Sequence, residues 1–380
     1  MNYDFSPEEA AFRADLHAWL LANIPAVRPD PADEEKFMVF LRSWHRDLAK
    51  SGWLGLSLPK EAGGRGFAPV YESIFNEEIA LTDAPPTPRN VSFIARSLIG
   101  FGTAEQQHRF LPTLLSTEEM WCQGFSEPGA GSDLAALSTR AVLDGDAYVL
   151  NGQKVWTTFG KWADWCLVLA RTDPEVPKHK GISAIAVRMD SPGITVAPNH
   201  QIDHSEELSE VFFDDVRVPA SQRVGQPGDG WRLAMQTVAF ERGPADVGSV
   251  ARNSRLLLQL ERAARQGQFD GVPDVRRRLA RLFVHTEVLR LHVLRSLTAR
   301  EKGAPGPEGS VDKLMVGRCE QELARLHLEL VQETALLGAD IPALHNYLHS
   351  RAMTIYGGTA QIQQNIIAQR VLGMPVGPKS

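Results

Sequence analysis

The apolar residues of this 380-residue chain change their spacing twice. Up to about residue 117 they recur every three or four positions, which is typical of helices with one buried face. They then form short runs around the turn dipeptides Asp144-Gly145 and Asn151-Gly152, which favour type I′ hairpins because glycine adopts positive φ without strain. The helical spacing returns near residue 223. We therefore expect an α+β fold: an N-terminal helical domain (1–117), a middle antiparallel β domain (118–222) and a C-terminal helical bundle (223–380).

Local signals predict where several helices begin and end. Ser6 with Glu9, and Thr103 with Gln106, have the spacing of capping boxes, in which two side chains each accept a hydrogen bond from the other residue's backbone. The apolar pattern also predicts a helix over 69–81.

A longer pattern predicts one helix from Trp231 towards Gln266. Pro244 falls inside it, where a proline removes a backbone hydrogen bond and kinks the axis. The alternative is that Pro244 begins a new helix, since proline is common in the first turn.

Composition and charge argue against several classes of protein. Forty Lys and Arg against 46 Asp and Glu give a net charge of −6, without the footprint of a nucleic-acid-binding protein. No stretch approaches ~18 consecutive apolar residues, so we expect no transmembrane helix. The three cysteines are widely spaced without a Cys-x-x-Cys pair. We therefore expect no disulfide framework and no metal site, and a cytoplasmic protein by default.

Residues 125–133 read Phe-Ser-Glu-Pro-Gly-Ala-Gly-Ser-Asp and carry groups that bind anions. The glycines, Gly131 among them, leave backbone N–H groups accessible, and Ser126 and Ser132 add hydroxyl donors. The run is neither G-x-G-x-x-G nor a P-loop, because no Gly-Lys-Ser/Thr follows. Taken alone, it is more typical of a tight loop between domains.

Residues 151–158 read Asn-Gly-Gln-Lys-Val-Trp-Thr-Thr. A hairpin here would present Trp156 beside Thr157 and Thr158, an arrangement that can stack on a flat ring and bond its heteroatoms. The alternative is a buried strand tryptophan with surface hydroxyls. Residues 210–219, Glu-Val-Phe-Phe-Asp-Asp-Val-Arg-Val-Pro, predict only the end of a β domain.

Near the C-terminus, residues 354–363 read Thr-Ile-Tyr-Gly-Gly-Thr-Ala-Gln-Ile-Gln. Together with the runs at 125–133, 151–158 and 210–219 and the pair Glu241-Arg242, this run forms a series of five motifs. The order and spacing of these motifs resemble those of flavin-dependent acyl-CoA dehydrogenases. The resemblance spans most of the chain. It implies that family's fold, with FAD between the β domain and the C-terminal bundle. It points to a branch with a glycine, Gly357, where many members carry the catalytic glutamate.

The resemblance also assigns residues to FAD. Two meet the edge of the isoalloxazine, three flank its ring, two lie in the glycine-rich loop, and three bind elsewhere on the cofactor. In that order they are Phe125 and Ser126; Trp156, Thr157 and Thr158; Gly131 and Ser132; and Thr359, Ala360 and Gln361.

The family's reaction is α,β-dehydrogenation of an acyl-CoA, in which a base removes the α-proton as the β-carbon passes hydride to flavin N5. The α C–H is too weak an acid to ionise unaided, so the thioester oxygen must receive hydrogen bonds that strengthen as enolate charge develops. The resemblance implies a flavin ribityl hydroxyl and the backbone N–H of Gly357 as donors. Gly358 allows close approach, and Ser132 and Arg242 also face the substrate.

Glycine cannot accept a proton, so the base must come from elsewhere. Glu241 matches the position from which some branches of the family supply it. A kink at Pro244 would turn Glu241 towards the substrate, and an apolar flavin site would raise its pKa, as suits a base. The alternative is that Glu241-Arg242 is a surface ion pair.

Two segments that many relatives use to bind a neighbouring subunit's FAD, Arg-x-x-Phe-Gly and Gln-x-x-Gly-Gly-x-Gly, do not occur in this sequence. The pattern resembles a bacterial branch acting on bulky acyl-CoAs, steroid side-chain and ring-fragment thioesters among them, with some α2β2 heterotetramers. We expect a homo-oligomer or such a heterotetramer, with an electron-transfer flavoprotein as electron acceptor. The alternatives are a non-catalytic or FAD-sharing subunit of a heteromer, and a flavin oxidase.

Overall fold

A computed structural model describes residues 4–31, 33–203, 205–240, 243–301, 306–331 and 341–375. The chain forms two compact units, each assembled from segments that are distant in the sequence. We call them the helical unit (Met1–Ile24, Ala68–Ala84 and Glu241–Ser380) and the sheet unit (Pro25–Phe67 and Pro85–Phe240).

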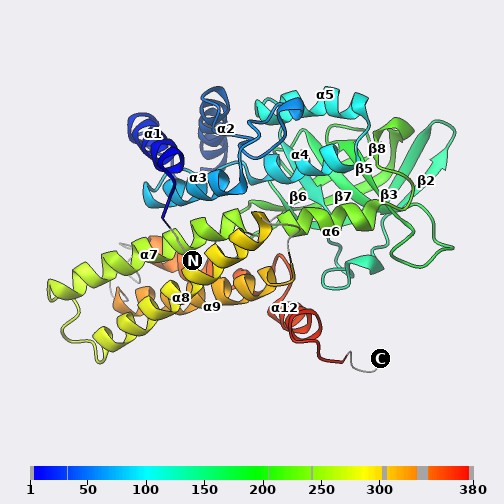
Figure 1. The fold of residues 1–380 in the computed structure, drawn as a ribbon. Coiled ribbons are helices and arrows are strands. Elements are labelled where there is room, and N and C mark those ends of the chain that lie inside the picture. Colours follow the sequence, from blue (N-terminus) through cyan, green and yellow to red (C-terminus); the bar gives the residue numbers. More distant parts are fainter. Residues whose placement is uncertain are drawn as a thin grey trace. The chain divides into compact units, whose positions relative to one another are not determined.

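The sheet unit is built on one eight-stranded sheet (Figure 1). The strand order is β6-β7-β3-β2-β4-β5-β8, and β1 pairs with β4 beside this path. Most described strand pairs are antiparallel, as expected, but β1 and β2 each pair with β4 in parallel. The strands are β1 (Trp121–Gly124), β2 (Arg140–Asp144), β3 (Ala147–Thr158), β4 (Trp165–Arg171), β5 (Ile182–Arg188), β6 (Ile194–Pro198), β7 (Leu208–Pro219) and β8 (Arg223–Val224).

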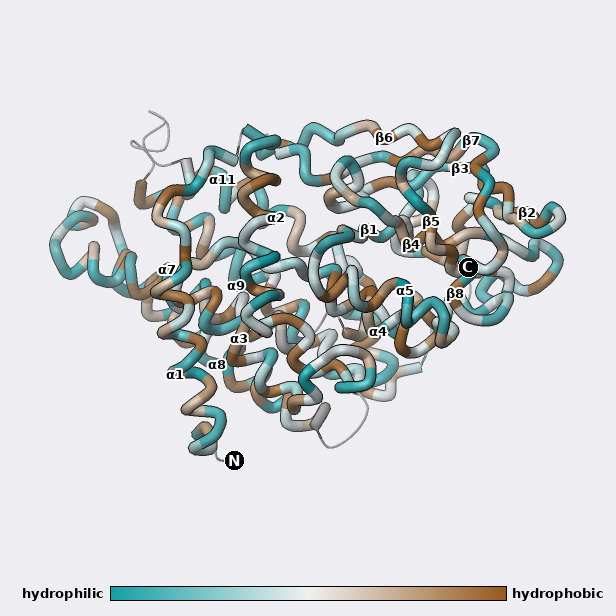
Figure 2. The backbone as a smooth tube through the Cα atoms, turned by 90° about the horizontal axis from the view of Figure 1, so that it is seen from above, coloured by the Kyte–Doolittle hydropathy of each residue, from teal (hydrophilic) through white to brown (hydrophobic). Residues whose placement is uncertain are grey.

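Strand β4 shows how this sheet carries hydrophobic core on both faces. Trp165 points to the face covered by helices, where its ring lies 5.0 Å from that of Phe110. The next residue, Cys166, points to a second cluster, made mostly by strand residues, which includes Val211. Because both faces are buried, the strand is an unbroken apolar run, and hydrophobic segments follow β4 and β5 in Figure 2. The helices of this unit are α2 (Glu34–Lys50), α4 (Arg89–Phe101), α5 (Ala104–Leu115) and α6 (Gly230–Phe240).

The helical unit packs long helices against one another. Successive apolar clusters join α7, α8 and α9, and α3 lies along α7. Glu78 of α3 accepts hydrogen bonds from Arg13 and His17 and so ties the N-terminal helix to this bundle. The helices are α1 (Pro7–Asn23), α3 (Pro69–Leu81), α7 (Pro244–Arg265), α8 (Val275–Glu301), α9 (Gly309–Leu330), α11 (Ile341–Ser350) and α12 (Ala360–Ile366), which continues as a π-helix over Ile367–Val371.

The structure confirms the helix ends that carry cap signals. Both capping boxes form, at Ser6 with Glu9 and at Thr103 with Gln106, and the helix expected over 69–81 is α3. Within the described residues, no helix combines the length and the apolar character that a membrane crossing requires.

Only one of the two turn dipeptides forms a hairpin. The chain turns after Asp144 at Gly145, which has φ +64°, and joins β2 to β3. Asn151-Gly152 instead lies inside β3, so the predicted second hairpin is wrong. Gly152 occupies an irregularity in the pairing with β7, and a Cβ there would come within 2.8 Å of Thr139. The glycine is required for close approach rather than for a turn.

The single helix expected from Trp231 to Gln266 is also wrong. Helix α6 ends at Phe240, and α7 begins at Pro244 after Gly243, whose φ of +96° is left-handed. The carboxylate of Asp246 accepts a hydrogen bond from the Gly243 N–H at 2.8 Å and caps the new helix. Pro244 therefore starts a helix, where its missing N–H costs nothing, and does not kink one.

Candidate functional site

The glycine-rich loop after β1 is held against strand β3. The backbone N–H of Val155 donates to the Ser126 carbonyl at 3.0 Å, and Phe125 packs partly buried on the core of the sheet unit. Farther along, Gly131 and Ser132 are exposed, and a Cβ added at Gly131 would meet nothing within 4 Å. The loop thus offers one end fixed to the sheet and one end open to a ligand.

The end of β3 presents an indole to solvent. Trp156 lies in an irregularity of the pairing between β3 and β7, with φ +61° and 60% of its surface exposed. Left-handed backbone is rare for a bulky residue, and such strain gathers at ligand sites. Thr158 is half-buried, whereas Thr157 is fully buried, with a hydroxyl that has no hydrogen-bond partner among the described residues. Trp156 and Thr158 are therefore the accessible members of the predicted trio.

These two segments are joined by a buried ion pair that the sequence analysis missed. Lys154 of β3 and Glu127 of the loop lie 2.7 Å apart, Nζ to Oε1. Lysine rarely lies fully inside a protein unless it is paired. A lysine directly before Val155, at a position where the strand alternation points inward, was the signal that could have revealed it.

The groups in the sheet unit fit an isoalloxazine. This ring system is flat and apolar along one side and carries polar atoms along its other edge, so an exposed indole and neighbouring neutral hydroxyls suit it. Trp156 supplies the indole, and Ser126 and Thr158 supply the hydroxyls. The two acidic side chains of the glycine-rich loop are engaged elsewhere: Glu127 with Lys154, and Asp133 with Lys178 at 2.7 Å.

In the helical unit, a second predicted segment forms a tight turn before α12. Gly357 and Gly358 have φ of +61° and +91°, and Gln363 donates through Nε2 to both of their carbonyls, at 3.3 and 3.2 Å. The Thr359 hydroxyl caps α12 by accepting from the N–H of Ile362 at 3.2 Å. Ala360 is half-buried and Gln361 is exposed.

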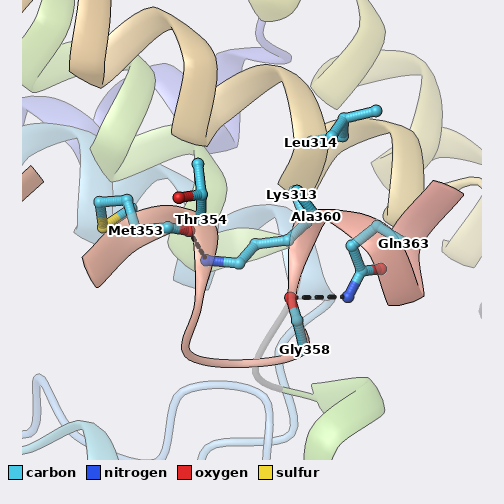
Figure 3. Close-up of a pocket in the computed structure, with 7 residues that line it drawn as sticks. All are labelled: Lys313, Leu314, Met353, Thr354, Gly358, Ala360 and Gln363. Carbon is cyan, nitrogen blue, oxygen red and sulfur yellow. Dashed lines mark hydrogen bonds between the residues drawn. The ribbon is translucent and has the colours of Figure 1, made fainter. Parts of the chain in front are cut away.

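Lys313 of α9 lies behind this turn (Figure 3). Its ammonium donates to the Met353 carbonyl at 3.0 Å and lies 4.4 Å from the centre of the Tyr356 ring. A Cβ at Gly357 would lie 3.9 Å from that nitrogen. A cavity of about 10 Å³, lined by Lys313, Met353 and Gly358 among others, has room for one water and not for an acyl chain.

The predicted base and its neighbour, Glu241 and Arg242, lie outside the described residues. The backbone on either side is described: α6 ends at Phe240, and Gly243 precedes α7. Their roles stay predictions, and each half of the candidate site is described on its own unit.

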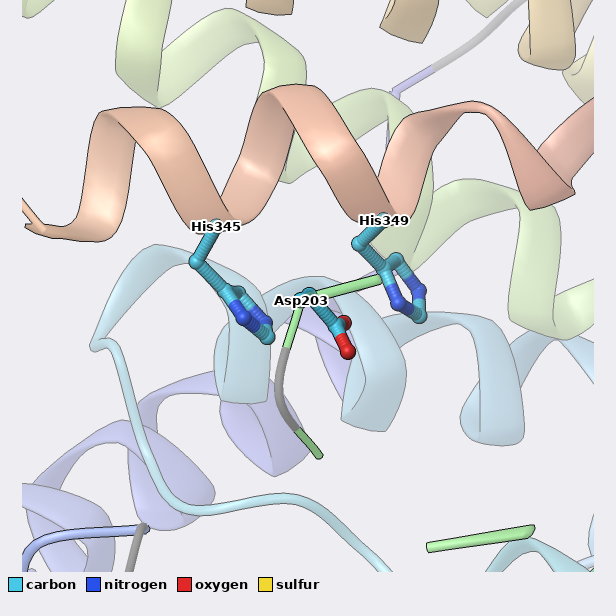
Figure 4. Close-up of side chains that lie close together, drawn as sticks. All are labelled: Asp203, His345 and His349. Atoms are coloured by element: carbon cyan, nitrogen blue, oxygen red, sulfur yellow. The ribbon is translucent and has the colours of Figure 1, made fainter. Parts of the chain in front are cut away.

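His345 and His349 are one turn apart on α11, with nearly parallel rings whose centres are 5.9 Å apart (Figure 4). Asp203, also drawn there, belongs to the sheet unit. Within either unit taken alone, the described residues bring no three His, Cys, Asp or Glu side chains together as metal ligands.

Comparison with known proteins identifies the family. Three family models match, covering most of the chain: the N-terminal domain of acyl-CoA dehydrogenases over 6–118, the middle domain over 122–216 and the C-terminal domain over 228–372.

Individual relatives agree with these matches. The acyl-CoA dehydrogenase IpdE1 of Mycobacterium tuberculosis is 40% identical, over 96% of this chain and 97% of its own. The acyl-CoA dehydrogenase FadE26 of the same organism is 31% identical over 99% of both. Among solved structures, the Tcur3481-Tcur3483 steroid ACAD and the ChsE4-ChsE5 complex from Mycobacterium tuberculosis are each 29% identical. Their TM-scores are 0.86 and 0.85, over 99% of this chain and 100% of theirs.

These matches confirm the expected family, and with it the expected FAD cofactor. The expected fold is confirmed too, because the helical N- and C-terminal regions and the central sheet are those of this family. The chain belongs to the acyl-CoA dehydrogenases, the FAD-dependent oxidoreductases that act on acyl-CoA thioesters.

Proposed function

We propose that this chain catalyses the α,β-dehydrogenation of a bulky acyl-CoA, with Glu241 as the base that removes the α-proton. The observation that carries the proposal is the exposed, left-handed Trp156 beside Ser126 and Thr158. Such a surface is costly to keep unless a flat ligand covers it.

The chain's own residues bind and orient the reactants. When bound, FAD supplies the hydride acceptor at its N5. We assign the isoalloxazine to Phe125, Ser126, Trp156 and Thr158. The backbone N–H of Gly357 is the donor to the thioester oxygen, where enolate charge develops, and a backbone donor does not depend on the side chain.

Position 357 is unsuited to the base for three reasons. A glycine has no group that accepts a proton, and its φ of +61° disfavours a larger side chain. A carboxylate there would also lie near the Lys313 ammonium, which would lower its pKa and weaken it as a base. In the sequence, Glu241 follows α6 directly and precedes Gly243. It matches the position from which some branches of the family supply their base.

The relatives suggest the substrate class and the assembly. One similar structure is that of a steroid ACAD, and another is the ChsE4-ChsE5 complex. We propose a steroid side-chain or ring-fragment acyl group, an α2β2 heterotetramer, and transfer of electrons to an electron-transfer flavoprotein. The sequence lacks the segments with which many relatives bind the adenosine half of FAD, which supports the presence of a partner chain. It also leaves a second function possible, that of an FAD-sharing subunit that does no chemistry.

The test is Glu241→Gln in the purified flavoprotein. A substrate that reduces the flavin bleaches its visible absorbance, so anaerobic mixing with ring-bearing acyl-CoAs reports the chemical step directly. Wild type should bleach. The variant should retain FAD, but its flavin should bleach at a rate lower by about 100-fold or more, the usual contribution of a positioned base.

Glu261→Gln is the matched control, because Glu261 lies on α7 and pairs only with Arg265 of the same helix in the described contacts. It should bleach like wild type. Full bleaching by Glu241→Gln would contradict the assignment of the base. Rapid reoxidation by oxygen with release of peroxide would indicate an oxidase instead.

A further inference from the structure

The charged pair inside the sheet unit is unusually complete. Lys154 has no exposed side-chain surface and Glu127 has 5%. Besides its contact with Glu127, the Lys154 ammonium donates to the Phe125 carbonyl at 3.2 Å. Its aliphatic stem crosses β1 at Gly124, where an added Cβ would lie 3.3 Å from the Lys154 Cγ.

The carboxylate is bonded on its other sides too. Oε2 of Glu127 accepts from the N–H and hydroxyl of Ser138 at 2.6 and 2.8 Å, and Oε1 accepts from the Thr139 N–H at 2.8 Å. Burial alone would raise the pKa of Glu127, but the Lys154 ammonium and these donors lower it to about 2. Burial lowers the pKa of Lys154, and the carboxylate opposes that shift. With so many donors on Glu127, we assign the proton to Lys154 at neutral pH.

The pair connects the two segments that carry the isoalloxazine residues. Glu127 follows Ser126 directly, and Lys154 precedes Trp156 by two residues. Together with the bond from Val155 to Ser126, it fixes loop and strand at three points. The irregular backbone at Trp156 begins immediately beyond this anchor.

A buried ion pair is a poor source of net stability, because desolvation of two charges offsets their attraction. Its value lies in geometry, since a charged pair inside a core tolerates few alternative arrangements. We infer that Lys154 and Glu127 are positioning residues, which hold Phe125 and Ser126 at a fixed distance from Trp156 for the flavin ring. This inference rests on the proposed flavin site.

The test removes both charges while keeping the shapes. In Lys154→Met/Glu127→Gln, the single amide oxygen of the glutamine still accepts from the N–H and hydroxyl of Ser138, but the bond from the Thr139 N–H and the tie to Phe125 are lost. Single removal of Lys154 would leave a buried charge unpaired and endanger folding. Four quantities are measured. The first is the FAD dissociation constant, obtained by removing FAD from the holoenzyme and titrating it back. The others are the shape of the flavin's visible spectrum, the reduction potential of the flavin and the melting temperature of the protein.

We expect a folded protein whose FAD dissociation constant rises about tenfold or more, equivalent to about 1.4 kcal/mol, with a changed flavin spectrum and potential. Lys178→Met is the control: it breaks the exposed pair with Asp133 on the same loop and should change none of these. If the double variant does not fold, Glu127→Asp serves instead. It keeps the charge but is too short to reach Lys154 and Ser138 together, and it should weaken FAD binding in the same direction.

A folded variant with unchanged affinity, spectrum and potential would overturn the positioning role, even if its melting temperature falls, and would leave the dehydrogenase function standing. A wild-type chain that binds no FAD, alone or with a partner, would contradict the proposed function and this inference with it.

Discussion

At the residue scale, Trp156 combines two features that seldom occur together. It is a bulky residue in left-handed backbone, and more than half of its surface is exposed. The left-handed backbone costs about 1–2 kcal/mol of folding free energy. Because much of the side chain is exposed, burial of its apolar surface offsets little of this cost. The sequence could indicate a tryptophan followed by two threonines as a ligand surface, but not its backbone conformation, which depends on the pairing irregularity with β7.

Trp156→Gly should therefore stabilise the FAD-free protein by about 1 kcal/mol while weakening FAD binding, because glycine adopts φ +61° without a clash. Trp156→Ala is the matched comparison. It also loses the ring but keeps the strained backbone, so it should bind FAD as poorly without the gain in stability. Urea unfolding and FAD titration measure both effects, and equal stability of the two variants would argue against backbone strain.

At the element scale, the chain breaks between α6 and α7, the segment of the sequence that carries the proposed base. Gly243 combines φ +96° with ψ −100°, a conformation open almost only to glycine. Gly243→Ala should destabilise the protein by about 1–3 kcal/mol and lower kcat in proportion to the displacement of Glu241. Gly271→Ala is the control, because Gly271 lacks a positive φ and a Cβ there meets nothing within 4 Å. Wild-type stability in Gly243→Ala would refute the special role of the break.

The same scale shows what sequence patterns could predict. Helix ends with side-chain caps were predicted correctly, because the signal and its bonding partner lie within three residues. Asn151-Gly152 and the long helix at 231–266 were not. A glycine signals both turns and close approaches, and only the contact with Thr139 distinguishes them. Likewise Pro244 is compatible with a kink and with a helix start, and the left-handed Gly243 decides between them.

Helix α2 carries a pH-sensitive contact. The ring of His45 hydrogen-bonds the Pro86 carbonyl through Nε2 at 2.9 Å, and burial lowers the pKa of His45 to about 4. An unfolded histidine titrates near 6.5, so the folded state binds fewer protons between these values. Its contribution to stability is complete above about pH 6.5 and is lost as the pH falls towards 4.

From this shift we expect the free energy of unfolding to fall by about 2 kcal/mol between about pH 7 and about pH 5 through His45 alone. His45→Gln retains a donor for the Pro86 carbonyl and does not titrate. The free energy of unfolding of this variant should therefore fall by about 2 kcal/mol less over the same pH range. Urea unfolding at several pH values measures the difference. Parallel pH profiles for the two proteins would exclude His45 as the cause.

At the scale of the whole molecule, motif order identified the family, whereas the connections between motifs came only from the structure. Lys154 and Glu127 are 27 residues apart in the sequence, and neither belongs to a spacing pattern that links them. The division of the chain into units also depends on contacts between distant segments. Helices α1 and α3 lie in the predicted N-terminal domain, but they belong to the same compact unit as the C-terminal helices.

The assembly provides the last prediction. The chain carries the groups that we assign to the isoalloxazine, but it lacks the two segments with which many relatives bind a neighbour's FAD. Two identical copies would therefore leave the adenosine half of each cofactor weakly held. In the proposed α2β2 assembly, a different partner chain supplies those contacts. Expressed alone, the chain should purify nearly colourless. Co-expressed with its partner, it should yield a heterotetramer with about one FAD per pair of unlike chains, measured by native mass spectrometry and flavin absorbance. A yellow homo-oligomer with one FAD in every chain would show that this protein completes its own site.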